Sequence, residues 1–156
     1  MHTLPAPPFK GMGKLIHIAA WAILFGLPFF FTGRESQTVT VLSYVRSMIV
    51  PLSFMLVFYA NYFVLIDHFL FAKRPWKFLL CNVVLIAASM GAVHLMFELL
   101  PHPEWEHPRP EREWQETVGF FMVNAMLYML VAGLSVAIKM TGSWYEMESS
   151  RRELEK

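Results

Sequence analysis

Histidine and carboxylate side chains gather in one part of this chain, and both groups bind metals or titrate. His94 and Glu98 lie four residues apart, so they share one face of a helix. Imidazole and carboxylate suit a divalent ion such as zinc, and imidazole also changes charge near neutral pH. Metal binding, proton sensing and a solvated acidic loop are the three open interpretations. The cluster comprises His94, Glu98, His102, Glu104, Glu106 and His107.

The sequence contains no other group of residues that predicts chemistry. It has no glycine-rich phosphate loop, no His-Glu-x-x-His motif, and no nucleophile beside a base. The single cysteine, Cys81, cannot form an intramolecular disulfide. The net charge of +1 is too small to indicate binding to nucleic acid. We therefore predict no catalytic residue, no nucleic-acid partner and no cofactor other than a divalent metal at the cluster above.

Four apolar stretches must position these residues. They cover residues 15–31, 47–66, 78–100 and 118–138, and none of them contains Asp, Lys or Arg. A helix rises ~1.5 Å per residue, so ~20 apolar residues cross a hydrocarbon core of ~30 Å. The chain is 56% hydrophobic and 16% charged. The sequence predicts an all-α, polytopic membrane protein whose four transmembrane helices form a bundle with short loops.

The distribution of basic residues predicts the orientation of this bundle. With four spans, the two termini and the 67–77 loop share one side of the membrane. That side carries nine of the 13 basic residues, and basic residues favour the cytoplasmic side. We therefore expect both termini to be cytoplasmic. The nine are Lys10, Lys14, Lys73, Arg74, Lys77, Lys139, Arg151, Arg152 and Lys156.

Polar residues within the spans form a second candidate set. Pro51 lacks an amide hydrogen, which predicts a kink in the second span. Asn124, Tyr128 and Ser135 share one face of the fourth span, and Asn61 lies in the second. Lipid offers these side chains no partner, so we expect them to point into the bundle and hydrogen-bond between helices. Ligand binding by the same face is the alternative.

The segment 144–156 differs in composition from the apolar stretches before it. It is charged and helix-prone, and Glu148 and Arg152 are spaced for an i,i+4 ion pair. Trp144, Met147 and Leu154 follow the spacing of a coiled-coil seam. We interpret 1–143 as a transmembrane domain and 144–156 as the start of a cytoplasmic signalling helix.

Two segments resemble one family of signalling proteins. Asn61–Lys77 resembles the junction of the second and third helices in LytS-like bacterial sensor histidine kinases, and Glu148–Lys156 resembles their linker. The family's phosphoacceptor occurs in a His-Phe-Leu-Phe-Asn context. His68 begins a similar run, but Ala72 replaces the asparagine and the run lies at a membrane edge. His68 is therefore not expected to accept phosphate.

The resemblance implies a function for the whole chain. It would be the sensory and anchoring domain of a two-component sensor kinase, and its fourth helix would pass a signal to a kinase module. The implied partners are the lipid bilayer, a second copy of the chain, that kinase module and a response regulator. The implied location is the bacterial cytoplasmic membrane. The alternative is a standalone small membrane protein, such as a channel or transporter subunit or an assembly factor.

Thiol labelling tests the predicted orientation. In a Cys81→Ala background, cysteines replacing Lys73 or Ser149 should resist an impermeant thiol reagent in intact cells. A cysteine replacing Glu106 should react, because its loop is expected to face outward. The reverse labelling pattern would overturn the orientation.

Overall fold

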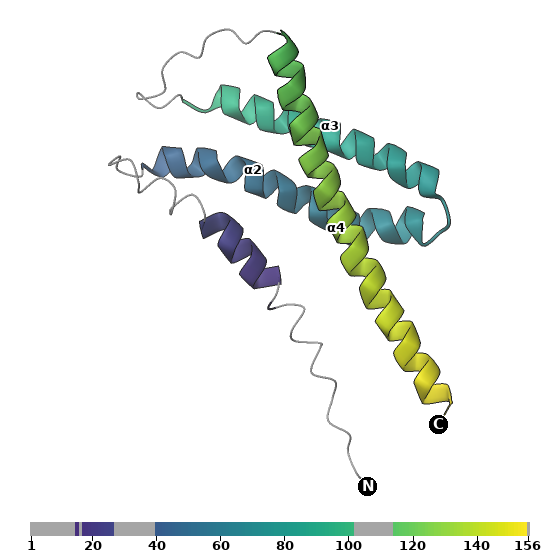
Figure 1. Cartoon of the computed structure of the whole chain (residues 1–156). Coiled ribbons are helices and arrows are strands. Elements are labelled where there is room, and N and C mark those ends of the chain that lie inside the picture. The colour runs from purple at the N-terminus through teal and green to yellow at the C-terminus, as the bar shows by residue number, and fades with distance from the viewer. Residues whose placement is uncertain (1–14, 16, 27–39, 102–113, 156) are drawn as a thin grey trace. The chain divides into compact units, whose positions relative to one another are not determined.

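The structure, a computed structural model, describes residues 15, 17–26, 40–101 and 114–155 (Figure 1). Every regular element in these residues is a helix, and they contain no strand. The chain divides into two compact units, Met1–Pro51 and Leu52–Lys156. The all-α fold class predicted from the sequence is confirmed.

The first long helix, α2, covers Val41–Ala60 and contains Pro51. Its first turn is closed by a hydrogen bond of 3.1 Å from the Tyr44 amide to the Thr40 carbonyl. Proline cannot donate to the carbonyl four residues earlier, but the helix continues past it to Ala60. Pro51 coincides with the boundary between the two units. The kink predicted there stays a prediction.

A π-helix, η1, follows α2 directly and covers Asn61–Leu70. Its wider hydrogen-bond ring is visible where the Phe71 amide donates to the Ile66 carbonyl, five residues back, at 2.9 Å. Ten residues of π-helix are unusual, because this conformation mostly occurs as single-turn bulges, often at functional sites. Together α2 and η1 form a 30-residue apolar run, Val41–Leu70, with a mean hydropathy of 2.0. The run is longer than the predicted 47–66 span.

The next helix, α3, covers Pro75–Leu99 and runs back beside η1 (Figure 1). Pro75 suits the first helical turn, where its missing amide hydrogen would have no partner. The helix ends where Leu100 becomes extended, one residue before Pro101. With a mean hydropathy of 2.1 over 25 residues, it is long and apolar enough to cross a bilayer.

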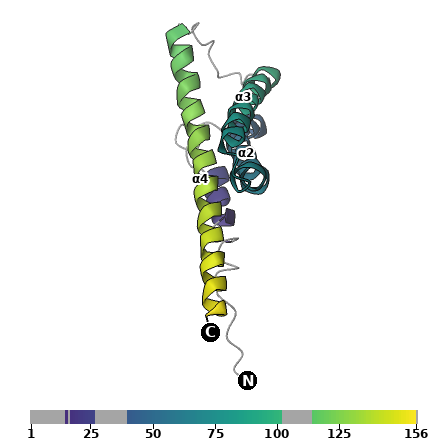
Figure 2. The same ribbon diagram turned by 90° about the vertical axis from the view of Figure 1, so that its right-hand side faces the viewer.

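The longest helix, α4, covers Trp114–Leu154 and has 41 residues. At ~1.5 Å per residue it is about 60 Å long, roughly twice the hydrocarbon core. The predicted 118–138 span and residues 144–154 of the predicted signalling segment are parts of one uninterrupted helix. α4 packs against η1 and α3, and its carboxyl-terminal part continues beyond them (Figure 1, Figure 2).

The predicted first span is described only in part. A short apolar helix covers His17–Gly26, and residues 27–31 lie outside the described residues. Three helices in the described part of the chain are long and apolar enough to cross a membrane, so the protein is a membrane protein. The fourth span stays a prediction.

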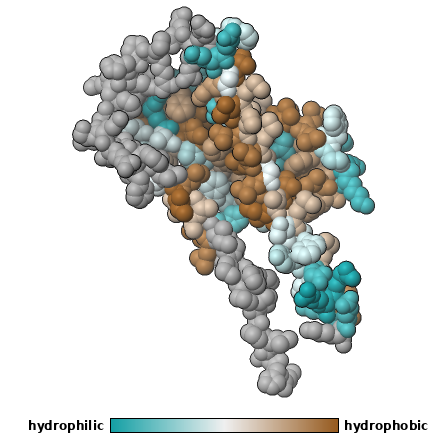
Figure 3. Space-filling model, viewed as in Figure 1, coloured by the Kyte–Doolittle hydropathy of each residue, from teal (hydrophilic) through white to brown (hydrophobic). Residues whose placement is uncertain are grey.

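Few side chains of these helices are buried by protein. The core of the second unit joins Val57 of α2, Ile86 of α3, and Tyr128 and Ala132 of α4. Only 17% of the most apolar window of α3, and the same share of α4, is buried. Much of the exposed surface of these helices is apolar, as the brown areas in Figure 3 show. Lipid is the solvent that such a surface requires.

Candidate functional site

A polar contact joins α4 to the end of α2 at the centre of the core. The hydroxyl groups of Ser53 and Tyr128 are hydrogen-bonded at 2.6 Å, and both residues are buried. The ring of Phe54 meets the Tyr128 ring edge-on, with 4.8 Å between the ring centres. Ser53 and Phe54 thus hold the two ends of one tyrosine side chain, the polar and the aromatic. We call this the Ser53–Tyr128 contact.

A second polar contact joins α4 to η1, and it is made by Lys139. The Lys139 Nζ donates to the Tyr62 carbonyl at 2.7 Å and to Asp67 Oδ2 at 2.8 Å. It also lies 4.8 Å from the centre of the Tyr62 ring, within range of a cation–π interaction. The Lys139 side chain is only 17% exposed, whereas that of Asp67 is 44% exposed. The π-helix therefore supplies every partner of this ammonium group that the structure describes.

The two contacts lie on one face of α4. Tyr128, Ala132, Ser135 and Lys139 follow one another at steps of four, three and four residues, which is a single helical stripe. The middle two are small and buried, so the helices can approach closely between the contacts. Both contacts occur in the same order along the two chain segments, which means that the 52–70 segment and α4 run in the same direction.

Two buried asparagines use the nitrogen but not the oxygen of their side-chain amides for hydrogen bonds within the described residues. The Asn61 Nδ2 donates to the Val57 carbonyl at 3.0 Å, and the Asn82 Nδ2 donates to the Phe78 carbonyl at 3.1 Å. Within the described part of the chain, the buried Oδ1 of each asparagine has no partner. Each of these amides donates to the carbonyl four residues back along the chain, and the Asn61 bond spans the junction of α2 and η1.

The residues of the predicted polar face of α4 differ in whether their hydrogen bonds stay within α4 or reach another helix. Tyr128 bonds to another helix, whereas Asn124 donates to the Phe120 carbonyl at 2.8 Å and Ser135 to the Ala132 carbonyl at 2.6 Å. Ser135 is fully buried, and Asn124 is half-buried. The sequence therefore predicts the shared stripe of these residues, and the hydrogen bond to another helix is made by Tyr128.

The outer cluster is described only at its beginning. His94 Nε2 and Glu98 Oε1 are 3.2 Å apart on α3, and about two thirds of each side chain is exposed. The described residues contain no group of three or more His, Cys, Asp or Glu side chains placed to hold a metal ion. Four cluster members lie outside those residues, so metal binding and proton sensing stay predictions. They are His102, Glu104, Glu106 and His107.

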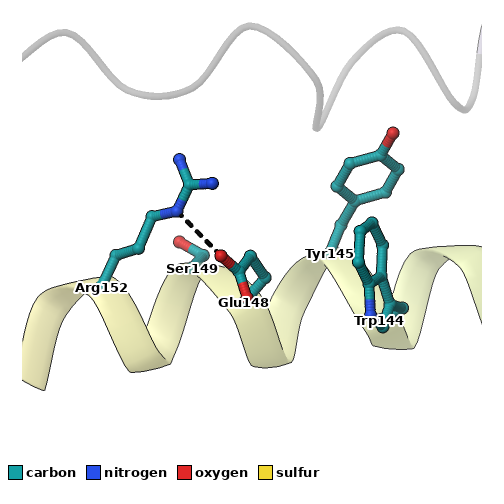
Figure 4. A pocket seen from close by; sticks show the side chains of 5 residues that line it. All are labelled: Trp144, Tyr145, Glu148, Ser149 and Arg152. Atoms are coloured by element: carbon teal, nitrogen blue, oxygen red, sulfur yellow. Dashed lines mark hydrogen bonds and ion pairs between the residues drawn. The ribbon is translucent and has the colours of Figure 1, made fainter.

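The carboxyl-terminal part of α4 is solvent-exposed and carries a shallow hollow (Figure 4). The predicted ion pair forms between Arg152 Nε and Glu148 Oε1 at 3.0 Å. The seam residues Trp144, Met147 and Leu154 are all exposed. The described residues that line the hollow all belong to α4. They are Trp144, Tyr145, Glu148, Ser149 and Arg152.

Sequence reasoning did not predict the interhelical contacts of Ser53, Asp67 and Lys139. A signal for the last two was present, because Asp67 directly follows the predicted 47–66 span and Lys139 directly follows the 118–138 span. Both positions were expected on the same side of the membrane. Opposite charges at adjacent span ends are candidates for pairing, since an unpaired charge at that depth is costly.

Comparison with models of protein families, with curated proteins and with solved structures finds no match to this chain.

A double-mutant cycle measures the Ser53–Tyr128 contact. Ser53→Ala and Tyr128→Phe each remove one hydroxyl, and the second change keeps the ring against Phe54. We expect a coupling free energy of about 0.6 kcal/mol and at most about 1.7 kcal/mol, as for interhelical hydrogen bonds in membranes. Reversible unfolding in mixed micelles gives the four stabilities. Strictly additive effects would show that the hydroxyl groups do not interact.

Removing the charge of Lys139 should destabilise the protein more than removing the Ser53–Tyr128 hydrogen bond. Lys139→Met leaves Asp67 and the Tyr62 carbonyl without their shared donor. We expect a loss of about 1–2 kcal/mol, between the values for exposed and for buried ion pairs, because Asp67 is partly exposed. Lys77→Met is the matched control and should change stability little. Adding Asp67→Asn to Lys139→Met should recover part of the loss, and a further loss would contradict the pairing.

Proposed function

We propose that this chain is the transmembrane sensory and anchoring domain of a sensor histidine kinase of the LytS-like kind. Its output would be a displacement of α4 that is passed to a cytoplasmic kinase module. The proposal has two sources of support. One is the resemblance of Asn61–Lys77 and Glu148–Lys156 to that family, and the other is the geometry of α4.

The continuity of α4 is the observation that carries the proposal. The helix runs from Trp114 to Leu154 without a break. Its first part packs on the hairpin made by residues 52–60, η1 and α3, and its last part is exposed. A helix transmits rotation or translation along its axis, because each turn is hydrogen-bonded to the next. A movement of Tyr128 or Lys139 would therefore reach Met147 without passing through a loop.

The two polar contacts give such a movement defined end points. Translation or rotation of α4 would have to break the hydrogen bond of Tyr128 to Ser53 or those of Lys139 to Tyr62 and Asp67. The small side chains of Ala132 and Ser135 between them present little steric resistance. A signalling switch needs two packings that differ by a few kcal/mol. Contacts of this strength are of the right size to set that difference.

The same geometry supports the proposed setting of the domain. Segment 52–70 and α4 run in the same direction, which supports placing Asp67 and Lys139 on one side of the membrane. The basic residues favour the cytoplasm for that side. The proposed domain has four spans and cytoplasmic termini, lies in the bacterial cytoplasmic membrane and acts as a homodimer. Its kinase module would phosphorylate a response regulator.

Insertion of residues into α4 tests this function. The chain is fused to the kinase module of a LytS-like kinase, and one to four alanines are inserted after Gly142. Each residue rotates the helix beyond it by ~100°. Autophosphorylation in proteoliposomes should change several-fold with the first two insertions and return toward the original level with four.

The control places the same insertions after Lys156, beyond the described helix. A uniform loss of activity at both places would indicate damage to the kinase module. Equal activity for all insertions after Gly142, with the fusion intact, would contradict transmission through α4 and favour a standalone membrane protein.

A further inference from the structure

The turn between η1 and α3 carries a concentrated positive charge. Every residue from 71 to 77 is exposed, and Lys73, Arg74 and Lys77 lie among them. Two aromatic side chains share the segment, Trp76 at 78% and Phe71 at 44% exposure. We call residues 71–77 the basic turn. In Figure 3 it forms the hydrophilic end of the hairpin, next to the apolar surface of the helices.

The cations of the basic turn are not neutralised within the described part of the chain. None of the three takes part in an ion pair there. The nearest carboxylate in the sequence is that of Asp67, and it is bound by Lys139. The first turn of α3 contains no acidic residue. The three positive charges are therefore available to an external anion.

The backbone places one of these cations at a conformational cost. Lys73 has a φ of 56°, in the left-handed region. Two hydrogen bonds close the turn around it, from the Lys73 amide to the Leu70 carbonyl at 3.1 Å and from the Arg74 amide to the Phe69 carbonyl at 2.8 Å. This is the pattern of a helix end whose left-handed position usually carries glycine. A lysine held where glycine fits without strain indicates a use for its side chain.

The neighbours of the turn indicate the chemistry of its partner. Leu79 and Leu80 begin the lipid-facing surface of α3 within a few residues of the cations, and both are more than half exposed. Indole side chains such as that of Trp76 prefer the level of the lipid head groups. An anion that reaches the cations at this depth must belong to the bilayer surface.

We propose that the basic turn is a binding site for anionic phospholipid head groups, with Lys73, Arg74 and Lys77 receiving the lipid phosphate and Trp76 inserted beside it. Basic residues next to a membrane span bind acidic lipids through such contacts. The fixed turn makes the site more selective than a mobile basic tail, because its three cations have a defined spacing. The site depends on the membrane insertion of the chain and is independent of the proposed kinase role.

Lipid titration of the whole chain in detergent tests the proposal. Phosphatidylglycerol and phosphatidylcholine with the same acyl chains are the probes, and retained lipid is counted by native mass spectrometry. We expect stronger retention of phosphatidylglycerol. The double variant Arg74→Gln/Lys77→Gln should lower its affinity by about fivefold for each charge removed. The matched control, Arg151→Gln/Arg152→Gln, also removes two charges and should retain the lipid like the wild type.

Lys73→Gly separates lipid binding from folding. It removes a charge and relieves the left-handed strain, so the melting temperature without added lipid should rise while phosphatidylglycerol retention falls. A fall in both would indicate a structural role for Lys73 and overturn the proposal. Equal retention of the two lipids by the wild type, or equal losses in the two double variants, would also overturn it.

Discussion

The hydrocarbon core of a bilayer offers no hydrogen-bond partner, and this constraint governs the polar atoms in the apolar segments of the described helices. The backbone meets it by being helical throughout, with five-residue hydrogen-bond spacing in η1. Asn61, Asn82 and Asn124 meet it by donating to carbonyls four residues back along the chain. Tyr128 and Lys139 of α4 instead find partners on the hairpin.

These two contacts lie at the two ends of the stripe of α4 that packs on the hairpin. Between Tyr128 and Lys139 the stripe that faces the hairpin holds Ala132 and Ser135, whose small side chains fix no particular register. The register is set by the ends of the stripe, where a buried hydroxyl pair and a partly exposed ammonium group act. Interactions of this size are weak enough to be exchanged for others by a stimulus. The carboxyl-terminal part of α4 follows any such exchange, because it belongs to the same helix.

Hydropathy was sufficient to predict an all-helical membrane protein, because the composition of a span is dictated by the lipid around it. It did not predict where helices end, because a helix continues into water when the local sequence allows it, as α4 does past Ile138. The π-helix could not be predicted, since α- and π-turns have similar compositions and differ in hydrogen-bond spacing. The stripe of Tyr128 and Ser135 followed from periodicity. Periodicity could not identify Ser53 and Asp67 as the partners of Tyr128 and Lys139, because pairing depends on which helices meet and in which register.

A reversible lock at the Lys139 contact tests transmission through α4 most directly. In a Cys81→Ala chain fused to the kinase module, cysteines replacing Asp67 and Lys139 are joined by a short bis-methanethiosulfonate reagent, which bridges the space that the long Lys139 side chain spans to reach Asp67 and is released by reduction. The measurement is autophosphorylation in proteoliposomes before and after reduction. We predict that the cross-linked protein stays at one activity level and that reduction of the cross-link changes this level several-fold. A complete cross-link whose reduction leaves autophosphorylation unchanged would contradict the account.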